Sequence, residues 1–548
     1  MHRGLLLFVG AGAVCLMNPI HPMAQQPATT EWEYSKLDMT ISIDPNRGSL
    51  RISGDGELVT TGAPTSELRF RINGNWHTLN FDSLKITGAT VETNVLDPSH
   101  KAWRIADAHF SKEVEPGTRL SIHFEIVKDQ DSFPLAVKPN VAVAISDADW
   151  YPMPLEGNSE LPPGNLIFHL PLNWHAAPMG VLSNEEHIGN QNFETFESPR
   201  NRRRAFIAAP YKVYQSKSET GTNALYLLDA PVNNVSLLSA FDRGRKFLEE
   251  MYGPLPFPDY RIAEMPNDAV PWYGASEEGL IISRNEMMTS EEGLLGNLVH
   301  ELAHSWWGNK VKLSGPGSYL LNEGIAAFSG MKFFEKTYGH ERTTEESEFG
   351  SPTGSPDTTL FGYVQLWLAG KDTAISQLKS SNGDHYNIAQ TKGVWVLRML
   401  CDRLGEKRFY STMRGIIAND LTLTLPMFRQ AMVDSAPEDK GMAVFLAQWL
   451  DQPGIPVLDV RWRNTTKDGK TSATLSIFQG QPGNPYALKI DLKLMTRKGI
   501  LFRPVSIQGV ESRFEFGVPD DVVGVQLDPD HKLPIWRPEY GSYPSSSH

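Results

Sequence analysis

The sequence is poor in cysteine. Cys15 and Cys401 are the two cysteines among 548 residues, so one thiol is left if the first residues are removed. A disulfide framework of the kind that holds small secreted domains together is therefore excluded. The fold must be stabilised by packing, for which an apolar share of 40% is an ordinary value in a soluble globular protein.

Long runs of positive charge and long apolar runs are also missing. Lys and Arg total 51 against 64 Asp and Glu, which gives a formal net charge of −13. Because no basic patch stands out, nucleic acid is excluded as an expected partner. After residue 17, no segment reaches the roughly 18 consecutive apolar residues that a membrane helix needs. We therefore expect no stable membrane insertion once a leader is cleaved.

The first residues have the composition of such a leader. MHRGLLLFVGAGAVCLM joins a basic start to an apolar run from Leu5 to Met17, which is typical of a signal peptide. We expect residues 1–24 to be a signal peptide and the mature protein to be secreted or periplasmic. A short anchor that is never cleaved is the alternative.

The pattern of apolar residues changes twice along the chain. Over residues 31–215 apolar and polar residues alternate, with Asn, Gly and Pro at the breaks, which predicts an antiparallel β domain. Over 233–453 the apolar residues recur every three or four positions, as in amphipathic helices. Alternation returns over 455–536. We expect three domains in this order, followed by a disordered tail at 537–548.

The central motif is HELAH at residues 300–304, inside an apolar-periodic helix. At 3.6 residues per turn, His300 and His304 lie on one face of that helix, where both imidazoles can reach one zinc ion. A hydrolytic zinc needs a third protein ligand and one open position. Glu323, on a second predicted helix, supplies a carboxylate, whereas a histidine shortly after His304 is absent.

These residues are sufficient for hydrolytic chemistry. Zinc lowers the pKa of its water from about 15.7 to about 7. Glu301, beside the first ligand, can take the proton of that water and pass it to the leaving amine. The motif therefore predicts peptide-bond hydrolysis with one Zn²⁺ per chain. In an ordinary helix without a metal, burying two imidazoles and two carboxylates would be costly.

Three segments resemble one known family. HELAHSWWGN is similar to HELAHQWFGN, and LLNEGIAAF to WLNEGFA, of the aminopeptidase N and leukotriene-hydrolase family of zinc metallopeptidases, the gluzincins. WYGASEEGLI resembles the GAMEN motif of that family. The resemblance runs collinearly over most of the chain. It implies a multidomain α+β architecture with an N-terminal antiparallel β domain, a thermolysin-like α+β catalytic domain and a C-terminal β-sandwich.

The resemblance also implies a substrate site. Gly274, Ala275 and Glu277 match the family motif, whereas Ser276 and Glu278 depart from it. Gly274 and Ala275 would then contact the substrate. Glu277, or Glu278 in its place, would bind the free α-amine of the substrate, because a carboxylate pairs strongly with an ammonium group.

One family feature is changed in this sequence. The family's oxyanion-stabilising tyrosine corresponds to Gln390, in QTKG. Tyr386 lies one helical turn earlier, on the same face of the expected helix. Tyr386, Gln390 or neither of them stabilises the oxyanion, and losing one such donor costs roughly a hundred- to thousandfold in rate.

The expected function is that of an exported zinc-dependent aminopeptidase whose substrates are peptides with a free N-terminus. A zinc endopeptidase is the alternative if the glutamates of the GASEE segment do not close the end of the cleft. An alternative of another class is a non-catalytic peptide-binding protein that retains the peptidase fold, motivated by Gln390 at the tyrosine position. The sequence carries no signal for an oligomeric state.

Overall fold

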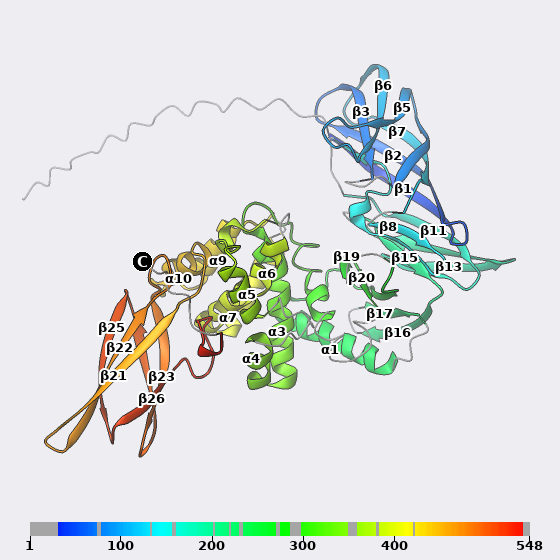
Figure 1. Ribbon diagram of the computed structural model, residues 1–548. Helices are drawn as coiled ribbons and strands as arrows, with labels where there is room; N and C mark the ends of the chain where they lie inside the picture. Colours follow the sequence, from blue (N-terminus) through cyan, green and yellow to red (C-terminus); the bar gives the residue numbers. More distant parts are fainter. Residues whose placement is uncertain are drawn as a thin grey trace, which may run out of the picture.

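The computed structural model describes most of the chain, and the expected signal peptide lies outside the described residues. The description runs from residue 31 to residue 540, apart from segments 74–77, 132–133, 156–159, 201–202, 219–220, 229–233, 270–273, 285–297, 349–358, 380–382 and 420–421. Three regions follow one another along the molecule, with the helices in the middle and β-sheets at both ends (Figure 1). The expected three-part architecture is thus confirmed.

The N-terminal region consists of strands. They are β1 (Glu31–Asp44), β2 (Ser49–Thr61), β3 (Thr65–Ile72), β4 (Leu79–Ile86), β5 (Ala89–Leu96), β6 (Arg104–Val114), β7 (Arg119–Lys128), β8 (Leu135–Lys138), β9 (Val141–Ala144), β10 (Met153–Pro154), β11 (Gly164–Pro171), β12 (His175–Pro178), β13 (Val181–Ile188), β14 (Gln191–Ser198) and β15 (Phe206–Ala209). Their order is β13-β14-β11-β1-β2-β7-β4, β10-β3-β6-β5 and β12-β15-β9-β8 in three sheets.

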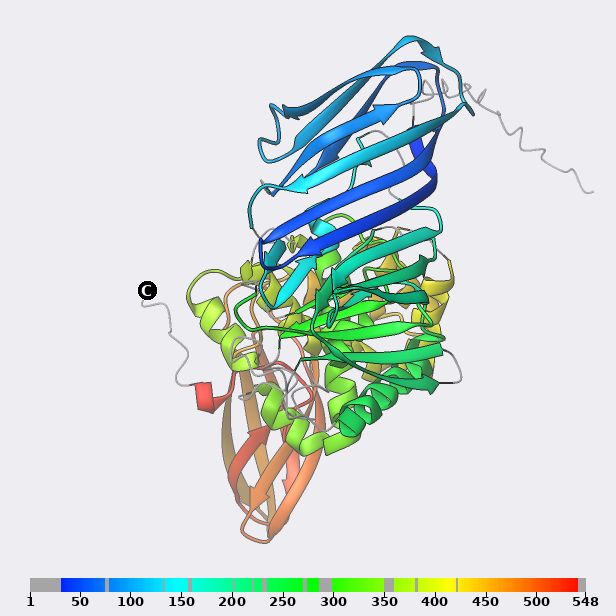
Figure 2. The same ribbon diagram turned by 90° about the vertical axis from the view of Figure 1, so that its right-hand side faces the viewer.

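The long strands of this region show the burial that their alternating sequence predicts. Along β1 every second residue is buried over most of its length, because successive side chains of a strand point to opposite faces. Figure 2 shows the broad twisted sheet that β1, β2 and β7 help to form. The region is not purely antiparallel, however. β1 pairs with β11 in parallel, with Met39 opposite Leu166, because a long connection carries the chain back before β11 begins.

The middle region contains one mixed sheet and a group of helices. Its sheet has the order β16-β17-β18-β20-β19. The elements are β16 (Lys212–Ser218), β17 (Gly221–Leu227), β18 (Tyr260–Met265), β19 (Gly274–Glu277), β20 (Leu280–Arg284), α1 (Asn234–Tyr252), α3 (Ile325–Tyr338), α4 (His340–Glu348), α5 (Leu360–Leu368), α6 (Gly383–Gln390), α7 (Lys392–Leu404), α8 (Glu406–Ala418), α9 (Leu425–Ser435) and α10 (Met442–Leu450).

Two expected boundaries of the middle region require correction. The N-terminal domain was expected to end at residue 215, which lies inside β16, and the helical domain to begin at 233. The hairpin β16–β17 instead belongs to the sheet of the middle region, because β17 pairs in parallel with β18. Alternation alone does not reveal which sheet a strand joins.

The C-terminal region is a pair of three-stranded sheets, β21-β22-β25 and β24-β23-β26. The strands are β21 (Leu458–Lys467), β22 (Lys470–Gln479), β23 (Leu488–Thr496), β24 (Gly499–Ile507), β25 (Glu511–Val518) and β26 (Val522–Leu527). The expected disordered tail begins too early at 537. Arg537 is 5% exposed and its guanidinium forms ion pairs with Glu348 and Asp528, so the chain stays packed to the short helix η6 (Pro538–Tyr540).

The helices and the C-terminal sandwich share one hydrophobic core. Buried residues of α1, α3 and α7 belong to the same cluster as Leu475, Ile490 and Val505 of the sandwich. A second large cluster fills the N-terminal region. None of the helices among the described residues is both long and apolar enough to cross a membrane. The candidate site lies where the mixed sheet meets the helices.

Candidate metal centre

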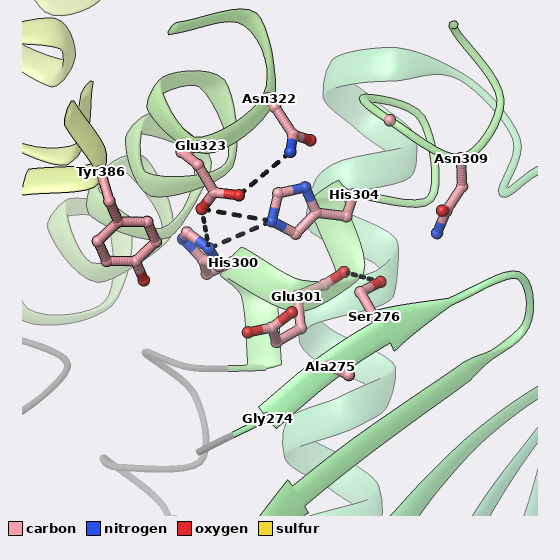
Figure 3. A pocket seen from close by; sticks show the side chains of 11 residues that line it. Gly274, Ala275, Ser276, His300, Glu301, His304, Asn309, Asn322, Glu323 and Tyr386 are labelled. Carbon is pink, nitrogen blue, oxygen red and sulfur yellow. Dashed lines mark hydrogen bonds and ion pairs between the residues drawn. The ribbon is translucent and has the colours of Figure 1, made fainter. Parts of the chain in front are cut away.

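His300, His304 and Glu323 converge in the middle region. His300 lies in the helical segment 298–303 and His304 in the turn that follows it. Glu323 is carried by η3 (Leu320–Gly324), a π-helical turn that leads directly into α3. The Nε2 atoms of His300 and His304 are 3.3 Å apart, and Glu323 Oε2 is 3.5 Å from the first and 3.9 Å from the second (Figure 3).

These distances fit a bound zinc ion. A tetrahedral zinc ion at about 2.0–2.2 Å from nitrogen and oxygen ligands holds those atoms roughly 3.3–3.5 Å apart. Two imidazoles and one carboxylate are a donor set that zinc prefers, and the three ligand atoms lie within 4.8 Å of one another. His300 is 7% exposed and His304 is 9% exposed. The predicted ligands are thus brought together in a geometry that suits the metal.

Hydrogen bonds fix the orientation of two of these ligands. His304 Nδ1 is 3.1 Å from the Trp307 carbonyl oxygen, so Nδ1 carries the proton and Nε2 is left to coordinate. Asn322 donates to Glu323 Oε1 at 3.1 Å, and Gln390 donates to Glu323 Oε2 at 3.1 Å. Such outer partners hold a ligand in its binding orientation before the metal arrives.

The local charges act strongly on Glu323. Burial alone would raise the pKa of its carboxyl group, but His304, His300 and the Gln390 hydrogen bond outweigh burial and lower that pKa to about 2. The carboxylate is therefore ionised at every pH at which the protein would work. Ionised carboxylate and neutral imidazole are the forms that bind metals.

Glu301 lies beside this centre without joining it. Its carboxylate lines a pocket of about 400 Å³ together with all three ligand residues. Burial is the main cause that raises its pKa to about 7, with His304 opposing and Glu323 reinforcing the shift. A carboxyl group that titrates near neutral pH is suited to accept and return a proton.

The strand β19 forms the opposite wall of the pocket. Gly274, Ala275 and Ser276 line it, and Ser276 donates a hydrogen bond to the backbone carbonyl of Glu301 at 2.8 Å. Among the described strands, β19 pairs with β20 alone, which makes it an edge strand. The Ser276 bond therefore fixes the edge of the mixed sheet against the helical segment that carries the histidines.

Tyr386 and Gln390 are both on α6 but occupy different places. Tyr386 lines the pocket, and Figure 3 shows its ring beside His300 and Glu323, with the hydroxyl group on the side of the pocket. Burial, followed by the nearby Glu323 and Glu301 carboxylates, raises the pKa of the Tyr386 phenol. It stays protonated and can donate. The amide of Gln390 is instead bound to Glu323.

Glu277 and Glu278 line a second, larger cavity. This cavity of about 710 Å³ adjoins the first, since Ala275, Ser276 and Asn322 line both. Glu277 Oε1 accepts a hydrogen bond from the Ser146 backbone N–H at 3.0 Å. Burial raises the pKa of Glu277 to about 7, although that N–H opposes the shift. Both candidate amine-binding residues are thus placed next to the metal pocket.

Sequence reasoning missed several residues of the site. Asn309 and Asn322 line both cavities, and Asn322 holds Glu323. The glycine at position 308 is the feature of the sequence that reflects this contact. Its φ is +115°, and a Cβ atom there would stand 2.7 Å from Asn322 Oδ1. A side chain at 308 would therefore push Asn322 away from the ligand. Asn322, the direct sequence neighbour of Glu323, is thus a hydrogen-bond partner of that ligand.

Comparison with known proteins agrees with this geometry. Residues 249–421 match the family model described as the peptidase family M1 domain. The mouse aminopeptidase RNPEPL1 is 25% identical over 248 residues, which cover 42% of this chain and 33% of that protein. Rat aminopeptidase N is 26% identical over 229 residues, 38% of this chain and 22% of that protein. The chain thus matches a third or less of the length of these relatives.

A solved structure shares the fold. The crystal structure of a mutant M1 zinc metallopeptidase from Deinococcus radiodurans, bound to a Tyr-Ser-Ala substrate, superposes with a TM-score of 0.57 at 15% sequence identity. The superposition covers 77% of this chain and 94% of that one. The similarity in fold therefore extends beyond residues 249–421, and it is the match of those residues to the family model that supports the family prediction.

Proposed function

We propose that this chain, which belongs to peptidase family M1, is a zinc-dependent aminopeptidase that removes N-terminal residues from peptides. One observation carries the proposal. Three zinc-type ligand atoms within 4.8 Å, the separate carboxylate of Glu301 and the protonated phenol of Tyr386 surround one pocket, and a further carboxylate, Glu277, lines the adjoining cavity. A protein that only binds peptides would not need the Glu301 carboxylate as a general base.

His300, His304 and Glu323 would hold one zinc ion per chain. When bound, zinc would polarise the scissile carbonyl group and make water acidic enough to ionise near pH 7. A dication at this position also favours the ionised form of Glu301, whose pKa is raised by burial in the metal-free protein. Gln390 and Asn322 keep the Glu323 carboxylate in place throughout.

Glu301 would move the proton in the reaction. Its carboxylate accepts a proton from the attacking water and returns it to the departing amine nitrogen, so one residue serves as base and then as acid. The phenol of Tyr386 donates a hydrogen bond to the oxygen that gains negative charge as the carbonyl carbon becomes tetrahedral. Gln390 is engaged with Glu323, which favours Tyr386 for this role.

Glu277 would select substrates by their free α-amine. An ammonium group in the larger cavity would pair with the Glu277 carboxylate, and Glu278 lines the same cavity. Such a pair is charge-assisted and requires that the amine carry its positive charge. A blocked terminus offers no ammonium. This arrangement supports exopeptidase action, and an endopeptidase would gain nothing from it.

We further propose that the protein is exported. The proposal rests on the basic and then apolar sequence of residues 1–24.

The proposed activity is tested with pairs of fluorogenic aminoacyl substrates, one of each pair with a free amine and the other N-acetylated. We expect zinc-dependent hydrolysis of the free members only, lost on chelation and restored by added zinc. Equal hydrolysis of acetylated peptides would establish an endopeptidase instead. Binding of the peptides without hydrolysis, at full zinc occupancy, would establish a binding protein.

A further inference from the structure

A second cluster of side chains that could hold a metal ion lies in the N-terminal region. Among the described residues, two groups of His, Asp, Glu or Cys place three ligand atoms within 4.8 Å of one another. The second group is His175 on β12, Glu185 on β13 and Glu194 on β14. β12 belongs to one sheet, whereas β13 and β14 form one end of the seven-stranded sheet.

The three side chains meet at the Nδ1 atom of His175. Glu194 Oε1 is 2.6 Å from it and Glu185 Oε1 is 3.7 Å from it. Glu194 is 2% exposed. Two hydrogen bonds hold its carboxylate in place. Oε2 accepts one from the Ala176 backbone N–H at 2.8 Å, and Oε1 accepts one from the Asn192 side-chain amide at 3.0 Å. The cluster is therefore anchored by backbone and buried amide contacts.

The register of the hairpin makes this cluster unusual. Glu185 and Glu194 are direct partners across the antiparallel ladder of β13 and β14. Like charges directly opposite each other destabilise a sheet, and here one of the two carboxylates is almost completely buried. A positive centre between them would offset this repulsion. His175 can supply one positive charge, and a divalent cation supplies two.

The strand β13 needs such a support. All its residues are exposed, and among the described strands it has β14 as its one neighbour, at the edge of the sheet. A strand that buries no side chain gains little from the hydrophobic effect, so its ladder hydrogen bonds must hold it. A cross-link from β13 to a strand of another sheet would hold the hairpin in place.

We propose that His175, Glu185 and Glu194 form a second, structural zinc site that ties β13 and β14 to β12. Imidazole and carboxylate ligands favour zinc over calcium or magnesium. In the metal-free protein a proton joins His175 to Glu194, and zinc replaces this proton as the ring and the carboxylate move apart from 2.6 Å to the roughly 3.3 Å that two ligands of one ion require. A solvent molecule completes the coordination.

The site has no means of hydrolysis. The three ligands carry both of the carboxylates at the cluster, so none is left over as a proton acceptor. Two further ionisable groups face the cluster: His187, whose Nε2 is 3.8 Å from Glu185 Oε1, and the Tyr226 phenol, whose pKa is raised mainly by burial and also by both carboxylates, so that it stays protonated and is no base. A hydrolytic centre keeps a general base apart from its ligands. The role that fits this cluster is therefore mechanical, and the substrate of the first site is not involved.

The test is a count of tightly bound zinc in the full-length mature protein, by elemental mass spectrometry after equilibration with zinc and removal of the free metal. We expect two zinc ions per chain in the wild type and one in Glu185→Ala, a change on an exposed strand that does not endanger folding. In a competition titration with a zinc indicator, His175→Gln should weaken the second site by roughly tenfold or more.

A matched control comes from another histidine. His123 also contacts two carboxylates, Asp55 through Nδ1 at 2.8 Å and Glu125 through Nε2 at 3.7 Å. Because these carboxylates lie on different ring nitrogens, one ion cannot collect all three residues, and His123→Ala should keep both zinc ions. Glu323→Ala separates the two sites, since it should lose the first zinc and keep the second. One zinc per chain in the wild type, unchanged by Glu185→Ala, would overturn the proposal.

Discussion

The two histidine and glutamate clusters differ in how the backbone assembles them. In the first, His300 and His304 stand four residues apart at the end of a helix, and one π-helical turn adds Glu323. In the second, each residue comes from a different strand, and the strands belong to two sheets. The spacing of residues along the chain brings the first cluster together, whereas the pairing of distant strands brings the second together.

Their surroundings differ as well. The first cluster borders a pocket with a spare carboxylate, Glu301, whereas the second consists of its ligands and the donors that hold them. Histidine and glutamate side chains thus support a reaction in the first cluster, whereas in the second they only hold strands together. What separates them is the presence of a base that is not a ligand and of space for a substrate.

A change of Glu301 should have the largest effect on activity. We expect Glu301→Gln to lower kcat by about 10² to 10⁴ while zinc binding is unchanged, because the amide cannot take a proton. Steady-state kinetics together with a zinc count check this. The matched change in the other cluster, Glu185→Gln, should leave kcat within about twofold of the wild type. Equal losses in both variants would contradict the division of roles.

Tyr386→Phe tests the oxyanion donor. Losing this hydroxyl should lower kcat by roughly a hundred- to thousandfold, with a smaller effect on KM. The phenol lines the pocket, so its removal leaves the ligands in place. A loss of less than about threefold in kcat would remove Tyr386 from the reaction.

Gln390→Ala tests the support of a ligand. We expect zinc to bind roughly 10 to 100 times more weakly, because the Glu323 carboxylate loses the donor that orients it. Activity at saturating zinc should fall much less. Gln430, which donates to Asp434 at 2.7 Å on an exposed surface, provides the matched control, and Gln430→Ala should bind zinc as the wild type does.

The Glu277 carboxyl group should make substrate binding depend on pH. Its pKa is raised to about 7, so below pH 7 the neutral form dominates and cannot pair with an ammonium. A free α-amine loses its charge above about pH 7.7–8.0. In the non-hydrolysing Glu301→Gln protein, Kd for a free-terminus peptide should therefore rise about tenfold per unit below pH 7. It should be flat there in Glu277→Gln/Glu301→Gln, and a parallel rise in that protein would refute the assignment.

The smallest effect concerns the stability of the metal-free protein. Glu185→Gln relieves the repulsion of Glu194 but weakens the contact with His175, so the free energy of unfolding should change by less than about 1 kcal/mol. With zinc present the same variant should be less stable than the wild type, because it lacks a ligand. Denaturant unfolding with and without zinc measures this reversal.

The residues that were found from sequence alone are those whose partners lie close along the chain. His300, Glu301 and His304 follow from helix geometry, and Glu323 from the ligand that a hydrolytic zinc still needs. The three-part architecture followed from the period of the apolar residues, but the place of β16 and β17 did not, because the pairing of β17 with β18 across 37 residues leaves no local pattern.

Contacts between residues far apart in the sequence could not be predicted. That Gln390 binds Glu323, 67 residues away, depends on how α6 packs on η3. That Glu277 meets Ser146 depends on how the N-terminal region packs on the mixed sheet. Contacts between such distant segments leave no regular spacing in the sequence. The cluster of His175, Glu185 and Glu194 was not predicted from the sequence for the same reason.

The most direct test adds zinc stepwise to the metal-free protein and follows bound zinc and hydrolysis of a free-terminus substrate in the same samples. We expect hydrolysis to rise over one equivalent of zinc only, and this rise to vanish in Glu323→Ala but not in Glu185→Ala. Full zinc occupancy without hydrolysis, or a rise that survives in Glu323→Ala, would contradict a zinc aminopeptidase built on His300, His304 and Glu323.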